Sequence, residues 1–283
     1  AGTVSMTLLP INHVYCLTMD IIKGLYIGMI ICINDSIMHV QRNMKLFKPE
    51  IVLLVPLVIE SIYGKLKDAG SLIHKKMVAK AAFGGSLRII CSGGAYLDPD
   101  YVDRFREYGI TILQGYGMTE CSPVISTNLE WENKKRSVGK LLPNCEARVV
   151  DEEIWVRGSS VMQGYYKMPE QTAETLEDGW LKTGDLGYVD EDNFVYITGR
   201  RKNLIILANG ENVSPEELEN QLSRSALVKE ILVREKDKII EAEIFPDYEY
   251  AKKKHIKDIQ GKLQELIDGF NKDMPVYKRI YSL

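Results

Sequence analysis

The chain has 283 residues, 45% of them hydrophobic, which is enough for more than one compact unit with its own core. The formal net charge is -3, and acidic and basic residues are interspersed. The sequence therefore lacks the basic surface that is typical of nucleic-acid-binding proteins. A negatively charged substrate would have to be bound by a local pocket, because no strong overall field attracts it.

The five cysteines are odd in number, and no two of them form a C-x-x-C pair. This pattern argues against a disulfide framework and against a zinc site, and it indicates a reducing, cytoplasmic compartment. The most apolar stretch, residues 21–33, contains Lys23 and is too short to span a bilayer. We expect it to form a buried helix and a buried strand, with membrane contact that is at most peripheral.

Short apolar runs alternate with helical patterns in the first part of the chain, residues 1 to about 137. Asp98 and Pro99 are suited to the N-cap and first position of a helix over residues 98–108. Strand–helix–strand order of this kind predicts an α/β fold with a parallel sheet and right-handed crossovers. The strands expected here cover residues 51–55, 87–91 and 110–113.

The pattern changes at about residue 138, where closely spaced strands and turns predict a small antiparallel, β-barrel-like subdomain that ends at residue 201. Residues 202–283 then predict a small α+β C-terminal domain. Its first helix has a strong start signal, with Ser214 at the N-cap, Pro215 next and Glu217 two positions later. A later helix should place apolar residues from Ile256 to Phe270 on one face.

Two glycine-containing loops follow two of the predicted parallel strands. The first is Ser92, Gly93, Gly94 and Ala95, and the second is the run Gln114, Gly115, Tyr116, Gly117, Met118, Thr119 and Glu120. Parallel strands end at one edge of the sheet, which is where open α/β sheets bind ligands. Glycines there allow a flat ring or a phosphate to approach the backbone. A plain tight turn explains Gly93 and Gly94 equally well, but it explains the seven-residue run poorly.

The second run resembles the core motif of the adenylate-forming superfamily, which contains acyl-CoA synthetases, luciferases and nonribosomal adenylation domains. The resemblance implies that Tyr116 stacks on adenine, that Thr119 contacts the α-phosphate and that Glu120 holds Mg²⁺, which makes Thr119 and Glu120 the catalytic residues. The nucleotide-binding residues that it implies are Gly93, Gly94, Ala95, Gln114, Gly115, Tyr116, Gly117, Met118, Thr119, Asp185 and Arg200.

Asp185 and Arg200 flank a predicted hairpin whose turn is formed by residues 190–193. Pairing of the two strands brings both side chains to the same end of the hairpin. A carboxylate can accept hydrogen bonds from both hydroxyls of a ribose, and the guanidinium can fix it or bind the sugar. By themselves the two residues would form a surface ion pair of little energetic value. Both match ribose-binding positions of the superfamily, however, and this favours the nucleotide role.

The run from Gly199 through Lys202 to Ile206 is most similar to the long-chain fatty acyl-CoA ligases within the superfamily. Lys202 occupies the position at which the smaller domain of these enzymes rotates between two half-reactions, so the resemblance implies a hinge there. His13 matches the family's motif on the acyl-substrate side, although a lone histidine beside apolar residues is more often structural.

The family's phosphate loop is expected before Ala1, and the lysine that orients the carboxylate is expected after Leu283. Two internal joints, at residues 150–154 and 66–83, are also short for the family. The substrates and cofactors implied are a medium- or long-chain fatty acid or another carboxylic acid, ATP, Mg²⁺ and coenzyme A, with no nucleic acid. The implied reaction is acid–thiol ligation through an acyl-adenylate. The alternatives are ligation to an acyl carrier protein, or a non-catalytic nucleotide- or acyl-binding module if the two missing parts are natively absent.

Overall fold

The structure is a computed structural model that describes residues 2–68, 74–207, 210–236 and 239–283. The chain divides into two compact units by its internal contacts. The first comprises residues 1–150, 154–183 and 188–196, and the second comprises residues 151–153, 184–187 and 197–283.

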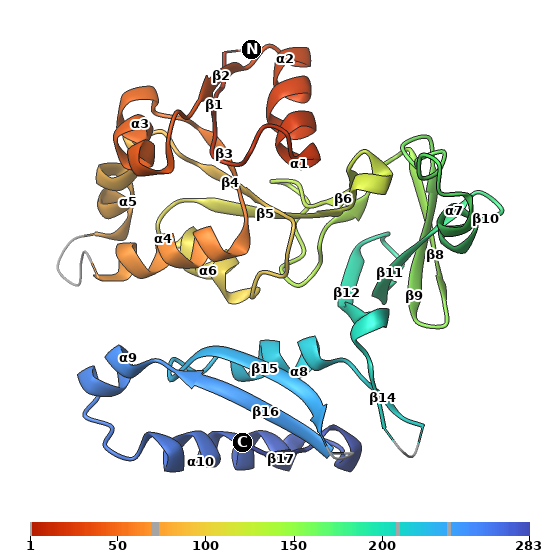
Figure 1. Cartoon of the computed structure of the whole chain (residues 1–283). Helices are drawn as coiled ribbons and strands as arrows, with labels where there is room; N and C mark the ends of the chain where they lie inside the picture. Colours follow the sequence, from red (N-terminus) through yellow and green to blue (C-terminus); the bar gives the residue numbers. More distant parts are fainter. Residues whose placement is uncertain (1, 69–73, 208–209, 237–238) are drawn as a thin grey trace. The chain divides into compact units, whose positions relative to one another are not determined.

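A seven-stranded sheet with the order β2-β1-β3-β4-β5-β6-β7 forms the centre of the first unit (Figure 1). Strands β1 to β5 are parallel, whereas β5, β6 and β7 pair in antiparallel fashion. The parallel α/β subdomain expected from the alternating pattern is therefore confirmed. The strands are β1 (Val4–Thr7), β2 (Ile30–Ile33), β3 (Ile51–Leu54), β4 (Ile89–Ser92), β5 (Thr111–Gly117), β6 (Val124–Thr127) and β7 (Lys140–Leu141).

Helices cover both faces of this sheet (Figure 1). On one face, Leu54, Ile90 and Ile112 pack with side chains of α3 (Val40–Phe47), α4 (Pro56–Asp68), α5 (Lys75–Phe83) and α6 (Asp100–Arg106). The opposite face is covered by α1 (Val14–Cys16), the π-helix η1 (Leu17–Ile22) and α2 (Lys23–Tyr26). Ser5 of β1 points to that second face, where its hydroxyl donates to Asp20 of η1 at 2.8 Å. The alternation of side chains along each strand separates these two layers.

The helix and strand expected within residues 21–33 are present as α2 and β2, but the prediction that they are buried is wrong. Leu25 is 68% exposed and Tyr26 is 90% exposed, and Ile30 and Ile33 of the edge strand are also exposed. In this helical segment the small or polar residues Cys16, Asp20 and Gly24 face the sheet instead. The apolar content of the segment therefore did not identify its buried side.

The start of α6 also differs slightly from the expectation. Pro99 is the N-cap residue, and Asp98 lies one position earlier. The Asp98 carboxylate nevertheless accepts the backbone N–H of Asp100 at 2.9 Å. The polar side chain thus serves the first turn of the helix as expected, but from the position before the cap.

A second sheet with the order β10-β11-β9-β8, in which β12 also pairs with β11, follows in the chain, and its β10–β11 pair is antiparallel. This confirms the small antiparallel subdomain that the closely spaced strands predict. Arg148 stacks between Trp155 and Trp180, with its guanidinium carbon 4.8 Å and 4.4 Å from the two ring centres. The elements are β8 (Cys145–Val150), β9 (Glu153–Gly158), α7 (Pro169–Thr175), β10 (Leu176–Glu177), β11 (Trp180–Val189) and β12 (Val195–Arg200).

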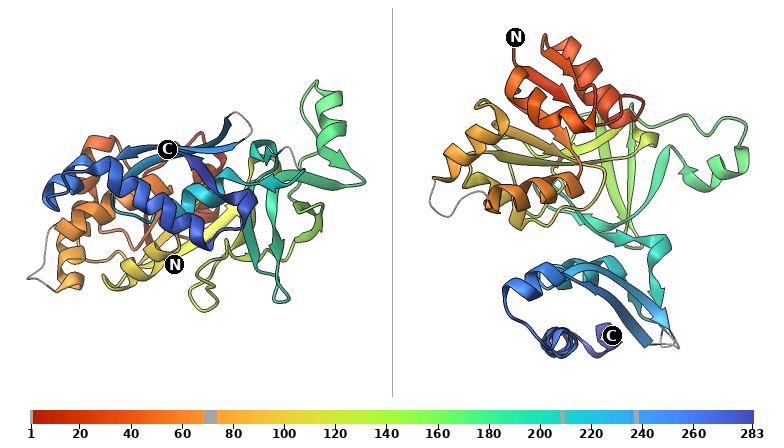
Figure 2. Two further views of the ribbon diagram at one scale, coloured as in Figure 1. Left: turned by 90° about the horizontal axis from the view of Figure 1, so that it is seen from below. Right: turned by 60° about the vertical axis from the view of Figure 1, so that its left-hand side comes forward.

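The α+β character expected for the last part of the chain is confirmed in the second unit. Its three-stranded sheet, β15 (Val228–Lys236), β16 (Ile239–Pro246) and β17 (Ile280–Ser282), packs against α8 (Pro215–Leu222) and α10 (Ile259–Asp273). Helix α10 runs along β15 and β16 (Figure 2). It begins after Ile256, which packs on the core from the preceding segment. The remaining elements are the short hairpin of β13 (Ile205–Ile206) and β14 (Asn212–Val213), and α9 (Tyr248–Lys253).

Candidate active site

The two glycine-containing loops lie side by side at one edge of the seven-stranded sheet. Strands β4 and β5 pair in parallel with Ser92 opposite Gln114, so both glycine-containing segments begin at the same edge, as the strand order predicts. The expectation that a loop starts at Gly115 is wrong, because residues 115–117 extend β5 by pairing with β6. Gly94 has a φ of 84°, a conformation that residues with a side chain rarely adopt. The turn after β4 therefore depends on glycine for its backbone shape.

Strand β5 changes its pairing within the glycine run. Its first part pairs in parallel with β4, and from Gly115 onward it pairs in antiparallel fashion with β6. A Cβ atom added to Gly117 would lie only 1.9 Å from the carbonyl oxygen of Pro123. Gly117 is thus required by the close approach of two backbone segments, and this structural reason exists whether or not a nucleotide also contacts it.

Tyr15 is a residue of this site that sequence reasoning missed. Its hydroxyl donates to the carbonyl oxygen of Cys91 at 3.3 Å, and its ring lies so close to Gly93 that an added Cβ would be 3.1 Å from it. Burial, followed by the nearby Cys91 and Asp20, raises the pKa of Tyr15 well above its usual value. No motif marks Tyr15, and only its position two residues after His13 could have drawn attention to it.

His13 is exposed and is the N-cap residue of α1, where its Nδ1 accepts the backbone N–H of Tyr15 at 3.2 Å. This contact gives the histidine a structural function at the helix start. Because α1 covers the face of the sheet on which Tyr15 meets Gly93, His13 lies in the same layer as that contact.

Glu120 follows β5 in the short 3₁₀-helix η3 (Thr119–Cys121) and is half-buried, whereas Thr119 is exposed. The Tyr165 hydroxyl donates to Glu120 Oε1 at 2.8 Å, and the Met162 backbone N–H donates to the Glu120 carbonyl oxygen at 2.8 Å. Burial, and then the bond to Glu120, raise the pKa of Tyr165. Tyr165 carried no signal in the sequence, since it lies 45 residues from its partner.

Glu120 suits a metal ion that arrives with a nucleotide. Across the described residues, no group of three or more histidine, cysteine, aspartate or glutamate side chains could hold an ion by itself. Mg²⁺ is often held by one or two carboxylates together with substrate phosphates and water. A single half-buried carboxylate beside the glycine loops matches that donor set.

The second unit contains the other predicted pair. Arg200 Nε lies 2.8 Å from Asp185 Oδ1, as the hairpin register predicts. The Asp185 side chain is only 4% exposed, whereas that of Arg200 is 51% exposed. The next residue forms a second ion pair, with an Arg201 guanidinium nitrogen 2.7 Å from Glu153 Oε2. Glu153 also accepts the Gly184 backbone N–H at 2.8 Å. Burial of the charged Asp185 carboxylate costs solvation free energy unless a partner compensates for it. The Asp185–Arg200 contact therefore differs from an ion pair between two exposed side chains.

Lys202 is exposed and lies in the 3₁₀-helix η4 (Arg201–Asn203), between β12 and β13. Gly199, three positions earlier in β12, packs tightly on the start of α8. A Cβ added to Gly199 would lie 2.2 Å from Ser214 Oγ. The segment before Lys202 is therefore fixed by close packing, whereas Lys202 itself is exposed.

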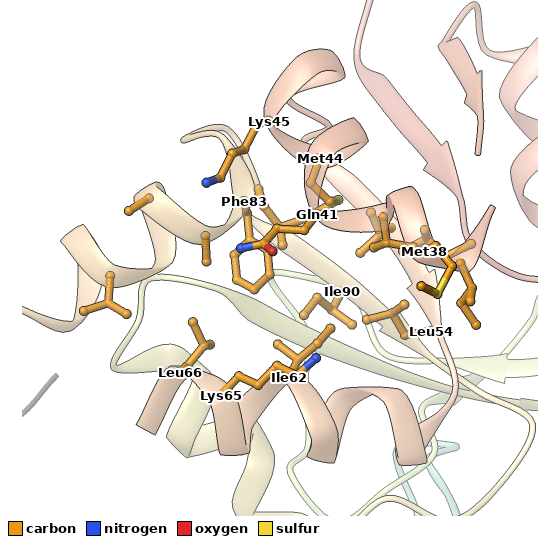
Figure 3. A pocket seen from close by; sticks show the side chains of 18 of the residues that line it. Met38, Gln41, Met44, Lys45, Leu54, Ile62, Lys65, Leu66, Phe83 and Ile90 are labelled. Carbon is orange, nitrogen blue, oxygen red and sulfur yellow. The ribbon is translucent and has the colours of Figure 1, made fainter. Parts of the chain in front are cut away.

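A cavity of about 870 Å³ lies on the helical face of the first unit, between α3, α4, α5 and the sheet (Figure 3). Most of its lining is aliphatic or aromatic, and Gln41, Lys45 and Lys65 add polar groups. None of the residues that the sequence assigns to the nucleotide lines it. The cavity is lined by Leu8, Ile37, Met38, Val40, Gln41, Met44, Lys45, Val52, Leu54, Ile62, Lys65, Leu66, Met77, Val78, Ala81, Ala82, Phe83, Leu87 and Ile90.

Two protein-family models match this chain. Residues 1–166 match the model of the AMP-binding enzyme family, and residues 202–282 match the AMP-binding enzyme C-terminal domain. The chain belongs to the AMP-binding enzyme family. The resemblance drawn from the glycine run is thereby confirmed.

Several curated AMP-binding enzymes are similar to this chain. The long-chain-fatty-acid–CoA ligase FadD15 of Mycobacterium bovis is 31% identical over 269 residues, covering 81% of this chain and 44% of that protein. A long-chain-fatty-acid–CoA ligase of Bacillus subtilis is 34% identical and covers 80% of this chain and 41% of that protein. The 2-succinylbenzoate–CoA ligase of Bacillus pumilus is 31% identical, covering 78% of this chain and 45% of that protein. The chain thus spans less than half the length of these relatives.

Solved AMP-binding enzymes share the fold. O-succinylbenzoate coenzyme A synthetase from Bacillus subtilis in complex with AMP is 26% identical, with a TM-score of 0.77 over 99% of this chain and 57% of that chain. The same enzyme in complex with ATP and magnesium ion is 25% identical, with a TM-score of 0.75 over 100% of this chain and 57% of that chain. Within the part of the chain that the structure describes, no helix is long and apolar enough to cross a membrane.

Proposed function

We propose that this AMP-binding enzyme activates a medium- or long-chain fatty acid as an acyl-adenylate and then transfers the acyl group to coenzyme A. The observation that carries the proposal is the pairing of β4 with β5, which puts the Gly93–Gly94 turn beside the run ending in Thr119 and Glu120. The ATP and magnesium ion in a solved relative support the nucleotide and metal assignments. The relatives themselves act on different acids, so the acyl substrate depends on further features of this chain.

In the first step the fatty carboxylate attacks the α-phosphorus of ATP, and pyrophosphate leaves. In the proposed arrangement Tyr116 stacks on adenine, the Gly93–Ala95 turn and the run from Gln114 to Met118 surround the nucleotide, and the Thr119 hydroxyl donates to an α-phosphate oxygen. A preorganised donor of this kind stabilises charge that develops in the transition state. Mg²⁺, when bound at Glu120, would supply electrostatic stabilisation of the phosphate oxygens.

In the second step the thiol sulfur of coenzyme A attacks the acyl carbonyl carbon, and AMP leaves. Asp185 is proposed to accept hydrogen bonds from the ribose hydroxyls, with Arg200 fixing its carboxylate. Its burial and the 2.8 Å bond to Arg200 support this assignment, because they hold the carboxylate in one orientation. Lys202 is proposed as the hinge residue between the two steps.

The cavity favours a long aliphatic acid over a compact aromatic one. Its volume of about 870 Å³ lies in the upper part of the range for small-molecule sites, and its lining is mainly aliphatic. We propose that the acyl chain occupies this cavity. Family resemblance puts His13 on the acyl-substrate side, but α1 covers the face of the sheet opposite this cavity, so we propose that His13 either acts at the carboxyl end of the substrate or only caps α1.

The test is release of AMP and pyrophosphate by the whole protein, measured across acids of increasing chain length, 4-coumarate and 2-succinylbenzoate, with and without coenzyme A. We expect the longer fatty acids to be the best substrates and acyl-CoA to form only with coenzyme A. Glu120→Ala should reduce pyrophosphate exchange at least tenfold, since metal or oxyanion contacts typically contribute this much or more. A preference for the aromatic acids, or exchange at the wild-type rate in Glu120→Ala, would contradict the proposal.

The chain-length preference has its own control. Ala82→Phe fills part of the cavity and should shift the preference toward shorter acids, whereas Ala173→Phe, on the exposed surface of α7, should leave it unchanged. His13→Ala should affect all acids equally if His13 acts near the carboxylate, and none if it only caps α1. Transfer to an acyl carrier protein in place of coenzyme A is distinguished by analysing the product with each acceptor.

A further inference from the structure

Glu120 is held at two points by one loop. The loop, residues 159–168, follows β9, and its Met162 backbone N–H binds the Glu120 carbonyl oxygen at 2.8 Å. Three residues later, the Tyr165 hydroxyl donates to Glu120 Oε1 at 2.8 Å. The first bond fixes the backbone of Glu120, and the second fixes the orientation of its carboxylate. One bond alone would leave the side chain free to rotate about its remaining torsions.

Tyr165 is itself anchored to the helix that follows the loop. Its backbone N–H donates to Thr172 Oγ1 at 2.9 Å, and the Thr172 hydroxyl donates to the Met168 carbonyl oxygen at 2.8 Å. The chain passes close to α7 just before Tyr165. The approach is so close that a Cβ added to Gly164 would lie 2.7 Å from Thr172 Cγ2. These contacts restrict the position of the tyrosine, which is half-buried, whereas its neighbour Tyr166 is 86% exposed.

We propose that Tyr165 is a positioning residue that orients the Glu120 carboxylate toward the metal ion of a metal–nucleotide complex. The phenolic hydroxyl occupies one lone pair of Oε1 and restricts rotation of the carboxylate, while among the described residues no side-chain donor is bonded to Oε2. Carboxylates that bind metals are commonly held by such outer hydrogen bonds, which reduce the cost of ordering the ligand. This inference rests on the proposed role of Glu120 in metal binding.

The test measures metal binding directly. Mn²⁺ is titrated into the whole protein in the presence of a non-hydrolysable ATP analogue, and free Mn²⁺ is followed by electron paramagnetic resonance. Tyr165→Phe keeps the ring and removes only the hydroxyl, so the dissociation constant for Mn²⁺ should rise about tenfold. The matched control is Tyr166→Phe, which removes the hydroxyl of the exposed neighbour and should leave that constant unchanged. Affinity for the analogue without metal should be unchanged in both variants.

Glu120→Ala separates failure of this inference from failure of the proposed function. We expect Glu120→Ala to weaken Mn²⁺ binding more than Tyr165→Phe does, and Tyr165→Phe to add nothing in the Glu120→Ala background. If Glu120→Ala weakens Mn²⁺ binding and Tyr165→Phe does not, the inference is overturned. A lower melting temperature of Tyr165→Phe would then show that Tyr165 only secures the loop. If neither change affects Mn²⁺ binding, Glu120 is no metal ligand, and both the inference and the metal part of the proposed function are wrong.

Discussion

Asp20 is a buried carboxylate on the face of the first unit that α1, η1 and α2 cover. It is 1% exposed, accepts the Ser5 hydroxyl at 2.8 Å and lies 3.9 Å from the Cys16 sulfur. Burial raises the pKa of Asp20 to about 6, against the smaller lowering effects of Ser5, Lys23 and Cys16. A carboxyl with a raised pKa favours the folded state most when it is protonated, and this contribution is lost as the pH rises from about 4 to about 6.

Asp20→Asn should therefore stabilise the protein at neutral pH. The amide stays neutral and its oxygen can still accept the Ser5 hydroxyl, so we expect the free energy of unfolding at pH 7.5 to rise by about 1–2 kcal/mol. At pH 4 the gain should vanish. Denaturant unfolding of the wild type and the variant across this pH range measures both values. Asp178→Asn, at an exposed position, is the control, and an equal response in the two variants would contradict the explanation.

Ser214 begins α8 and also ties this helix to the end of β12. Its hydroxyl oxygen accepts the Glu217 backbone N–H at 3.4 Å, and two acceptors surround its one proton, the Glu216 carboxylate at 2.9 Å and the Thr198 carbonyl oxygen at 3.1 Å. The close approach of Gly199 to Ser214 adds to this junction. At the scale of single elements, the strand and the helix are thus joined through one side chain.

Ser214→Ala should destabilise the second unit by about 1–2 kcal/mol, because an N-cap bond and a partly buried hydrogen bond are lost together. Hydrogen exchange of the α8 amides, with the melting temperature as a second measure, reports the loss. Ser223→Ala, at the exposed C-terminal end of α8, removes a comparable hydroxyl whose bond to the Glu219 carbonyl oxygen lies at the surface. A loss just as large in Ser223→Ala would show that the capping geometry is not the cause.

At the scale of the whole molecule, the chain divides into two contact-based units, and η4 lies within the second of them. Family models match residues 1–166 and 202–282, and the second match begins at Lys202. The contact-based units place residues 197–201 with the second unit. The proposed hinge at Lys202 lies at the start of the second family match, in a short helix where the Lys202 side chain is exposed.

Lys202→Pro should separate the two half-reactions. Proline fixes φ and removes a backbone N–H, so we expect adenylation to continue while acyl-CoA formation falls at least tenfold. Pyrophosphate exchange measures the first step, and acyl transfer from preformed acyl-adenylate to coenzyme A measures the second. Lys202→Ala is the control, because it removes the charge and leaves the backbone free. Equal loss of both steps in Lys202→Pro would argue against the hinge.

The sequence by itself determined those features that depend on local patterns. The alternation of strands and helices predicted the parallel sheet, the start signal at Ser214 predicted α8, and the glycine run identified the family. The pairing of Asp185 with Arg200 also followed from the sequence, because a hairpin turn fixes which residues lie opposite each other. These features depend on neighbours in the chain or on one strand pair.

Only the tertiary structure decided which groups meet across long separations. Tyr165 reaches Glu120 over 45 residues, and Tyr15 reaches Cys91 over 76, through helices and loops whose paths no local pattern specifies. It also decided that Gly117 is required by the nearby Pro123 carbonyl, and that Leu25 and Tyr26 of α2 and Ile30 and Ile33 of β2 are exposed although they are apolar. Composition measures how apolar a segment is, whereas burial depends on which elements pack on it.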